Sequence, residues 1–312
     1  MPEDEYVWLK SHDLLSFEEI SSLVDRFIAC GVDAVRLTGG EPLVRRDVHE
    51  VVRRLAAKPL RDLSMTTNGV LLAEQAQALK EAGLHRLTVS LDTLSPTKFA
   101  AMTKRNTHGA VLTGLAEAHR VRFDRGLKID TVVTRGVNDG ELVELIELAG
   151  RFDAELRFIE YMDVGGATRW SMGHVVSRAE MLEQLSKYFG PIEPVIEVSS
   201  APAERFRLRD GRTFGIIAST TQPFCGRCDR ARLTADGQFF NCLYAPNGVD
   251  LRAPLRAGQT ADELEARIAT RWSARVDRGA EERLALRGAR GPFASAAQLR
   301  DEPHLEMHTR GG

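Results

Sequence analysis

Apolar residues along the first half of the chain follow two alternating patterns, one typical of short strands and the other of amphipathic helices. Short apolar runs predict strands over residues 33–37, 63–67, 86–91, 127–133 and 155–161. Between these runs, helical spacing covers residues 48–57, 73–82, 110–122 and 141–152. Because strand and helix alternate, we expect right-handed crossovers and a parallel sheet, either open or curled toward a barrel.

The chain opens with a helix and not with a strand. Ser16 followed by Glu19 is the pattern of a capping box, and an apolar stripe continues through Phe27 until Gly31 ends it. Cys30 stands at the end of this apolar face. We therefore interpret Cys30 as a residue of the hydrophobic core.

Glycine-rich and polar turns follow the first three predicted strands. They cover residues 38–42 (TGGEP), 66–69 (TTNG) and 90–92 (SLD). In parallel α/β folds ligands bind where the strands end. Glycine permits close approach to the backbone, and hydroxyl and amide groups offer hydrogen bonds. Three such turns at equivalent positions predict a ligand site at this edge of the sheet.

After about residue 165 the alternation ends, which divides the chain into units of residues 1–165 and 166–312. Helical patterns over 178–189 and 261–278 and strand-like runs over 192–198, 206–209 and 214–218 predict a smaller C-terminal α+β domain. The last forty residues are rich in Ala, Arg and Gly, so we expect them to be loosely ordered.

Composition narrows the class of protein. The 312 residues are 43% apolar and 28% charged, with a net charge of −2, which describes an ordinary globular protein. A run of eighteen apolar residues, the least that a membrane helix needs, is absent. The acidic start is unlike a secretory signal, so we expect a cytoplasmic protein. The near-neutral charge disfavours a general nucleic-acid binder, which would carry excess cations.

Three of the four cysteines form a candidate metal site. Cys225, Cys228 and Cys242 give the spacing C-x2-C-x13-C, and Asp236-Gly237 predicts a hairpin that returns the third cysteine toward the first two. Structural zinc would need a fourth protein ligand, and the sequence between residues 174 and 304 offers no histidine. Three thiolates suit a [4Fe–4S] cluster with one iron open to a non-protein ligand.

Two arginines stand beside the second cysteine of this site. Arg230 and Arg232 are two residues apart on a predicted strand, so their side chains point the same way. Paired guanidinium groups suit a polyanion such as a triphosphate. The alternative is that both are solvated arginines in an Arg-rich chain.

These motifs, in their order along the chain, resemble those of the GTP 3′,8-cyclases of molybdenum cofactor biosynthesis, a family of radical S-adenosylmethionine (SAM) enzymes. The motifs are LTGGEPL at 37–43, TTNG at 66–69, VSLDTL at 89–94, GVND at 136–139, RFIEYM at 157–162 and FCGRCDRARLTADGQFFNCL at 224–243. The resemblance implies a partial (βα)6 TIM-like barrel that holds SAM, here without its first strand. It also implies a C-terminal domain whose [4Fe–4S] cluster on Cys225, Cys228 and Cys242 binds the guanine of GTP.

Carried over position by position, the resemblance assigns ligand contacts and leaves the catalytic residues unknown. The SAM contacts would be Gly40, Ser90 and Met162. The GTP contacts would be Arg36, Thr67, Lys128, Arg230, Ala231 and Arg232. The double glycine at 311–312 would reach into the active site. Asp130 and Asp229 are departures, since Asn is usual at both positions.

A third departure concerns the first cluster. The family carries C-x3-C-x2-C just after the first barrel strand, and this second, N-terminal [4Fe–4S] cluster holds SAM. The present 312 residues contain no such motif. We therefore expect the chain as written to bind the C-terminal cluster and GTP without cyclising GTP. A start codon assigned too far downstream, a fragment and a real loss would each explain this. The edge of the strand at 33–37 would then be exposed, which predicts poor solubility.

Two further hypotheses stay open. A non-catalytic iron–sulfur protein that binds nucleotides would lack the N-terminal motif, and translation of the DNA upstream of Met1 distinguishes it from the enzyme. A zinc ribbon that contacts nucleic acid is disfavoured by the net charge and by the missing fourth ligand. The resemblance also implies a downstream partner that forms cyclic pyranopterin monophosphate. The oligomeric state, including a homodimer, is not fixed by the sequence.

Overall fold

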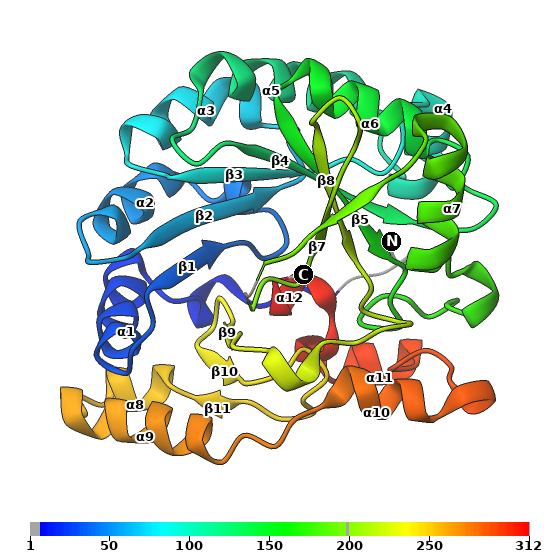
Figure 1. Cartoon of the computed structure of the whole chain (residues 1–312). Coiled ribbons are helices and arrows are strands. Elements are labelled where there is room, and N and C mark those ends of the chain that lie inside the picture. The colour runs from blue at the N-terminus through cyan, green and yellow to red at the C-terminus, as the bar shows by residue number, and fades with distance from the viewer. Residues whose placement is uncertain (1–6, 198–199, 312) are drawn as a thin grey trace.

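A curved eight-stranded sheet organises the molecule. This computed structural model describes residues 7–197 and 200–311, and the sheet has the order β1-β2-β3-β4-β5-β8-β7-β6 (Figure 1). The first six of these strands are parallel and the last two are antiparallel to their neighbours. The strands are β1 (Ala34–Leu37), β2 (Asp62–Thr67), β3 (Arg86–Ser90), β4 (Leu127–Val133), β5 (Ala154–Glu160), β6 (Glu193–Val195), β7 (Glu204–Arg207) and β8 (Thr213–Ile217). The predicted α/β class and its parallel sheet are confirmed.

Helices cover the convex side of the sheet (Figure 1). They are α1 (Phe17–Ala29), α2 (Val48–Ala56), α3 (Leu72–Glu81), α4 (Pro96–Thr103), α5 (His108–Val121), α6 (Leu142–Arg151) and α7 (Arg178–Phe189). Ser16 and Glu19 form the predicted capping box of α1. The sequence did not predict α4, although Ser95 caps it by accepting from the backbone N–H of Lys98 and Pro96 occupies its first turn.

Side-chain alternation along the strands separates an apolar layer from a polar one. In β4 the side chains of Leu127, Ile129 and Val133 are buried beneath the helices, in the main hydrophobic core. The alternate residues Lys128 and Asp130 are only half-buried. Because successive side chains of a strand point to opposite faces, these polar groups lie on the concave face of the sheet. The concave face is therefore the one equipped to meet a polar ligand.

A second, three-stranded sheet lies across the open side of the first one (Figure 1). It consists of β9 (Arg232–Leu233), β10 (Gln238–Phe240) and β11 (Val249–Asp250). The predicted hairpin is confirmed, since β9 and β10 are antiparallel and Gly237 has a φ of +87° in the turn. Leu23 and Phe27 of α1 pack with Phe239 and Ile268, which fastens this sheet to the start of the barrel.

The C-terminal region is more ordered than its composition suggested. Its helices are α8 (Arg252–Arg256), α9 (Ala261–Ser273), α10 (Gly279–Ala285), α11 (Ala296–Asp301) and α12 (Met307–Arg310). Arg290 and Arg310 are 7% and 3% exposed. The expectation of a loosely ordered tail was wrong, because buried arginines anchor it. Single-turn 3-10 helices occur at Ser11–Asp13, Pro42–Val44, Met172–His174, Cys225–Arg227, Arg287–Ala289 and Pro303–Leu305.

The interpretation of Cys30 as a core residue was also wrong. Its side chain is exposed, and the thiol contacts the backbone carbonyl of Glu265 on α9 at 3.6 Å. Helix α1 ends at Ala29, and Gly31 turns the chain with a φ of +95°. The helical stripe therefore stops one residue before Cys30.

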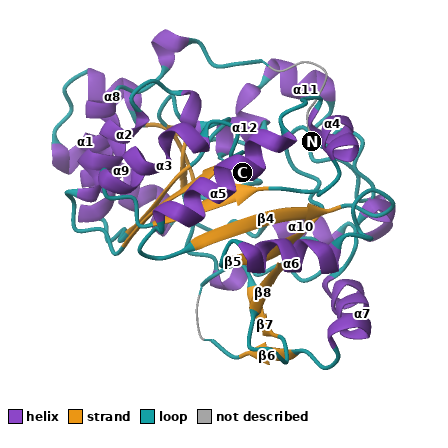
Figure 2. Ribbon diagram, turned by 90° about the horizontal axis from the view of Figure 1, so that it is seen from above, coloured by secondary structure: helices purple, strands orange, loops and turns teal. Residues whose placement is uncertain are grey.

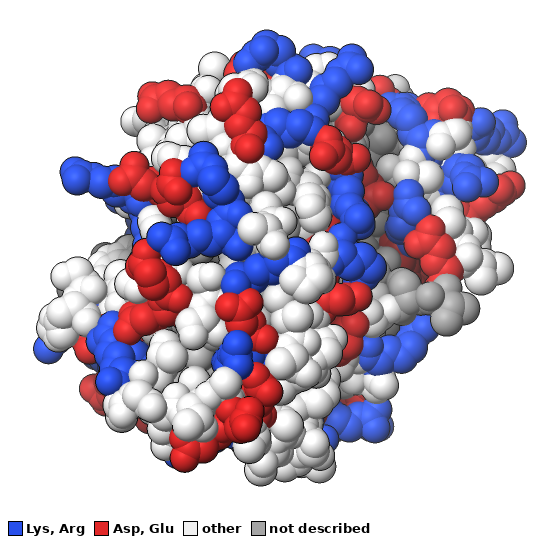
Figure 3. Space-filling view, turned by 90° about the vertical axis from the view of Figure 1, so that its left-hand side faces the viewer, with Lys and Arg blue, Asp and Glu red and all other residues white. Residues whose placement is uncertain are grey.

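Seen from above, α7 and strands β6 to β8 lie together at one end of the molecule, and α12 lies close to the curved sheet (Figure 2). On the face drawn in Figure 3, cationic and anionic side chains are interspersed. In the described part of the chain, each helix is too short or too polar to cross a membrane.

Candidate active site

The expected SAM positions lie at one edge of the sheet. Gly40 follows β1, Ser90 ends β3 and Met162 follows β5. These strands are parallel, so their carboxyl ends share an edge. A Cβ atom on Gly40 would come within 3.1 Å of the Trp8 ring. The glycine therefore lets the N-terminal segment pack closely against this turn.

Glu41 joins the first two strand-end turns. Its carboxylate accepts from the Thr67 hydroxyl at 2.7 Å, from the Asn68 backbone N–H at 2.6 Å and from the Leu43 backbone N–H at 3.0 Å. Burial raises the pKa of Glu41, and these hydrogen bonds oppose that rise. Thr67 is 2% exposed and its hydroxyl also accepts from the Gly69 backbone N–H. The structure thus places the Thr67 side chain inside the turn.

Cations line the concave face. Arg36 donates to the Thr66 hydroxyl at 3.3 Å, and Lys128 donates to Glu155 at 2.8 Å. Burial lowers the pKa of Lys128, and the neighbouring Arg157 lowers it further. Sequence reasoning missed Arg157, which donates to Glu155 at 3.2 Å. The signal was available, because Arg157 opens the RFIEYM motif on a strand adjacent to that of Lys128.

The three expected cluster cysteines lie in the loops around β9 and β10. Cys225 begins a 3-10 turn, Cys228 ends it, and Cys242 follows β10. Among the residues that the structure describes, no group of three or more His, Cys, Asp or Glu side chains is arranged around one ion. In a [4Fe–4S] cluster each thiolate binds a separate iron, so the three sulfurs need not converge on one point.

The surroundings of Cys228 and Cys242 fit an anionic iron–sulfur centre, whereas burial and the nearby Glu281 raise the pKa of Cys225. The Arg230 guanidinium donates to Cys228 Sγ at 3.3 Å, and the Tyr244 backbone N–H donates to Cys242 Sγ at 3.4 Å. Burial would raise the pKa of Cys228, but the Arg230 backbone N–H and the Arg275 guanidinium bring it below its usual value. Hydrogen bonds to cluster sulfurs are typical of such centres. The donor set therefore fits a [4Fe–4S] cluster.

Arg232 connects this loop with the concave face. Burial lowers its pKa to about 10, and the nearby guanidinium groups of Arg230 and Arg36 lower it further. Ala231 between the two arginines is exposed. The structure thus brings the cluster loop and the strand cations, expected from distant parts of the sequence, to one side of the sheet.

The C-terminal tail reaches the same region. Arg232 donates to the backbone carbonyls of Arg310 at 2.9 Å and Gly311 at 2.8 Å. Gly311 has a φ of +69°, and a Cβ atom there would lie 2.5 Å from Thr38 Cγ2 in the turn after β1. Both the left-handed backbone and the close approach to Thr38 favour glycine at this position. Gly312 lies outside the described residues.

Replacing Gly311 by alanine is expected to displace the tail from Arg232. A left-handed conformation costs a side-chain residue about 1–2 kcal/mol, and the contact with Thr38 adds to that cost. Hydrogen exchange, measured by mass spectrometry, should show lower protection of residues 307–311 than in the unaltered chain. Gly288→Ala is the matched control, because a Cβ atom there meets nothing within 4 Å. Equal protection in both variants would contradict the steric argument.

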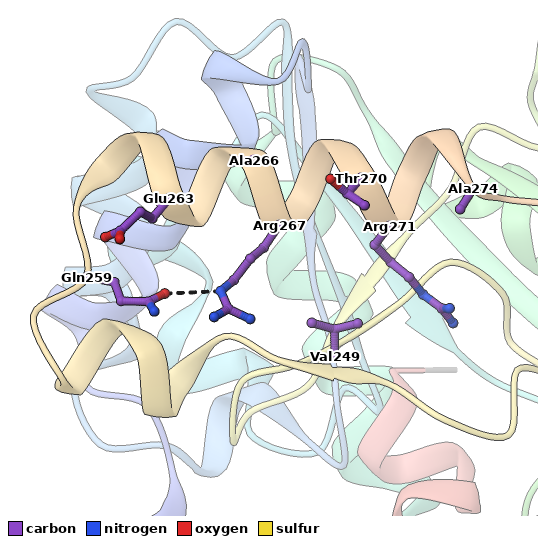
Figure 4. Close-up of a pocket in the computed structure, with 8 residues that line it drawn as sticks. All are labelled: Val249, Gln259, Glu263, Ala266, Arg267, Thr270, Arg271 and Ala274. Carbon is purple, nitrogen blue, oxygen red and sulfur yellow. Dashed lines mark hydrogen bonds between the residues drawn. The ribbon is translucent and has the colours of Figure 1, made fainter.

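One cavity lies outside this region, and another lies beside the cysteine loop. A groove of about 580 Å³ runs along α9, where Arg267 donates to Gln259 at 3.0 Å (Figure 4). The groove is lined by none of the residues assigned to SAM, GTP or the cluster. A cavity of about 320 Å³ is lined by residues beside the first cysteine, including Phe224, Gly226 and Arg227.

The comparisons with known proteins agree with this architecture. Residues 6–149 match the family model of the radical SAM superfamily, and residues 154–280 match the model named Molybdenum Cofactor Synthesis C. The crystal structure of Streptococcus suis SuiB bound to S-adenosylmethionine has a TM-score of 0.58 and 13% identity, covering 82% of this chain and 61% of that one. At this identity the likeness shows the fold alone.

Relatives in sequence define the family more closely. GTP 3′,8-cyclase 1 of Mycobacterium tuberculosis is 56% identical over 317 residues, covering 100% of this chain and 88% of the relative. GTP 3′,8-cyclase of Acidothermus cellulolyticus is 44% identical over 284 residues, covering 88% of this chain and 78% of the relative. The chain belongs to the GTP 3′,8-cyclase family of radical SAM proteins. Membership of this superfamily implies a [4Fe–4S] cluster and SAM as cofactors.

Proposed function

We propose that this protein serves the cyclisation of GTP to (8S)-3′,8-cyclo-7,8-dihydroguanosine 5′-triphosphate in molybdenum cofactor biosynthesis, in the cytoplasm. The observation that carries the proposal is the shared location of two features. Arg232, beside the cysteine loop, interacts electrostatically with Arg36 of β1, and Arg36 and Lys128 both lie near the Asp130 carboxylate on the concave face. A nucleotide whose purine binds at the loop would have its phosphates close to these cations.

The residues of the chain have distinct roles in this proposal. Cys225, Cys228 and Cys242 would hold the C-terminal cluster, whose open iron takes the guanine. Arg36, Lys128, Arg230 and Arg232 would bind the triphosphate. The turns at Gly40, Ser90 and Met162 would hold SAM. When bound, the cofactors would supply radical chemistry, which the protein directs by orienting the partners and excluding water.

The charge on the concave face supports a triphosphate as the polar part of the ligand. Glu155 is shared by Lys128, Arg157 and Arg205, at 2.8, 3.2 and 2.9 Å. Arg205 also pairs with Glu197 at 2.7 Å, and the Asp130 carboxylate lies among Arg36, Lys128 and Arg157. These three cations face two carboxylates, Asp130 and Glu155, so one positive charge is left over. Cations in a partly buried site bind phosphate oxygens more strongly than they do in water. The nucleoside guanosine, which has no phosphates, should therefore bind far more weakly than GTP.

The test compares two polypeptides after anaerobic reconstitution with iron and sulfide. One has the present 312 residues, in which Cys30 is the only cysteine outside the C-terminal trio. The other carries in addition any in-frame upstream coding sequence that contains C-x3-C-x2-C. Equilibrium dialysis with GTP, guanosine and ATP measures binding, and mass spectrometry detects the cyclised nucleotide.

We expect both polypeptides to prefer GTP, and only the second to cleave SAM and form the product. Absence of GTP binding by iron-loaded protein would overturn the proposal. GTP binding without product in both polypeptides would favour the alternative, a non-catalytic iron–sulfur protein that binds nucleotides. In the proposed pathway the product passes to an enzyme that forms cyclic pyranopterin monophosphate, and a homodimer is compatible with this function.

A further inference from the structure

Tyr244 links the cluster loop to the barrel. It lies two residues after Cys242 and is 6% exposed. Its backbone N–H donates to Cys242 Sγ at 3.4 Å, and its hydroxyl donates to Asp163 Oδ1 at 2.8 Å. One residue therefore touches a cluster sulfur through its backbone and a barrel carboxylate through its side chain.

The carboxylate of Asp163, which accepts from Tyr244, is held in place by arginines. Its fully buried carboxylate also accepts from Arg290 at 2.9 and 3.0 Å and from Arg283 at 2.7 Å. Asp163 directly follows Met162, one of the expected SAM contacts after β5. Arg283 belongs to α10, but Arg290 lies outside both α10 and the cysteine loop. Arg290 therefore holds the acceptor of the Tyr244 hydroxyl independently of that loop.

Tyr244 also packs against the start of α10. A Cβ atom on Gly279, the first residue of that helix, would lie 2.4 Å from Tyr244 Cβ. Helix α10 contacts the 3-10 turn that begins at Cys225, and the backbone of Ala280 and Glu281 opposes the rise that burial causes in the pKa of the Cys225 thiol. The contact between Tyr244 and Gly279 therefore sets the start of the helix that packs against Cys225.

We propose that Tyr244 is a positioning residue of the C-terminal iron–sulfur centre, setting Cys242 through its own N–H and Cys225 through α10. The proposal rests on the proposed function, because it requires a cluster on these cysteines. It goes beyond that function by assigning control of the centre to a residue that is not a ligand. Groups that orient metal ligands typically change metal affinity about 10–100-fold when they are replaced.

Two substitutions separate the contacts of Tyr244. Tyr244→Phe keeps the ring against Gly279 and removes only the hydrogen bond to Asp163. Tyr244→Leu removes the ring as well. Thr131→Val is the matched control, since this 0% exposed hydroxyl donates to the Leu91 carbonyl at 2.6 Å within the barrel core. All three variants lose a buried hydroxyl hydrogen bond, but only the first two lie beside the cysteines.

The measurements use anaerobically reconstituted protein that thermal unfolding shows to be folded. They are iron and sulfide per chain, the rate of iron release to a chelator, and the electron paramagnetic resonance spectrum of the reduced centre. We expect iron release about 10-fold faster in Tyr244→Phe and up to about 100-fold faster in Tyr244→Leu, with altered spectra in both. Thr131→Val should match the unaltered chain in rate and spectrum, even where its unfolding temperature falls.

Identical rates and spectra for Tyr244→Phe, Tyr244→Leu and Thr131→Val would overturn the proposal. That outcome would leave the proposed function standing, since the unaltered chain would still carry iron and bind GTP. An unaltered chain that holds no iron would instead refute both. The two failures are therefore distinguishable in one set of samples.

Discussion

A chain in which Cys228 is replaced by serine is expected to lose its C-terminal cluster, and with it the binding of GTP. The hydrogen bonds to Cys228 favour a thiolate, because the Arg230 and Arg275 groups outweigh the effect of burial and lower the pKa of Cys228. A serine hydroxyl does not ionise near neutral pH and is a poor ligand for iron. The iron content should fall from about four atoms per chain toward zero. Iron and sulfide analysis after anaerobic reconstitution measures this loss.

The matched control is Cys30→Ser. Cys30 is exposed, and its thiol contacts the Glu265 carbonyl on α9. This variant should keep its full iron content and bind GTP as the unaltered chain does. Full iron in Cys228→Ser, or equal loss in both variants, would contradict the assignment. Zinc without iron or sulfide in the unaltered chain would restore the zinc hypothesis.

Much of the barrel could be predicted because its strands are short apolar runs with clear local patterns. The ranges expected for the first five strands agree with β1 to β5 to within one residue at each end. The pairing of β8 with β5 had no such signal, since Leu156 and Phe214 meet only through the tertiary fold. Helix α4 was missed because only Phe99 and Met102 of its eight residues are buried, which is too few for an apolar stripe.

The candidate site also has one part that local sequence patterns predict and another part that they do not. The strand-end turns and the cysteine spacing are local motifs, so the sequence was sufficient to select them. The network at Asp163 depends on contacts across 81 residues to Tyr244 and 127 residues to Arg290. In a chain rich in arginine, sequence alone does not distinguish a buried guanidinium such as Arg290 from a solvated one. Only packing makes that distinction.

Replacing Arg232 by lysine is expected to weaken the binding of GTP about 10- to 100-fold. Lysine keeps the charge but cannot present the same fork of donors, of which one nitrogen already serves the Arg310 and Gly311 carbonyls. A hydrogen bond to a charged group contributes about 1.5–3 kcal/mol, and 1.4 kcal/mol is tenfold in affinity. Arg232→Met, which removes the charge as well, should bind GTP more weakly than Arg232→Lys does.

Equilibrium dialysis of iron-loaded protein provides the measurement, with Arg267→Lys as the control. Arg267 is an exposed residue of α9 in the groove of Figure 4, and none of the residues assigned to SAM, GTP or the cluster lines that groove. Because the pKa of Arg232 is lowered to about 10, the residue stays protonated at neutral pH. Its contribution to GTP binding should be constant there and fall as the pH rises through about 10. Unchanged affinity in Arg232→Met would show that the triphosphate lies elsewhere, and the arrangement of cations proposed for the concave face would have to be abandoned.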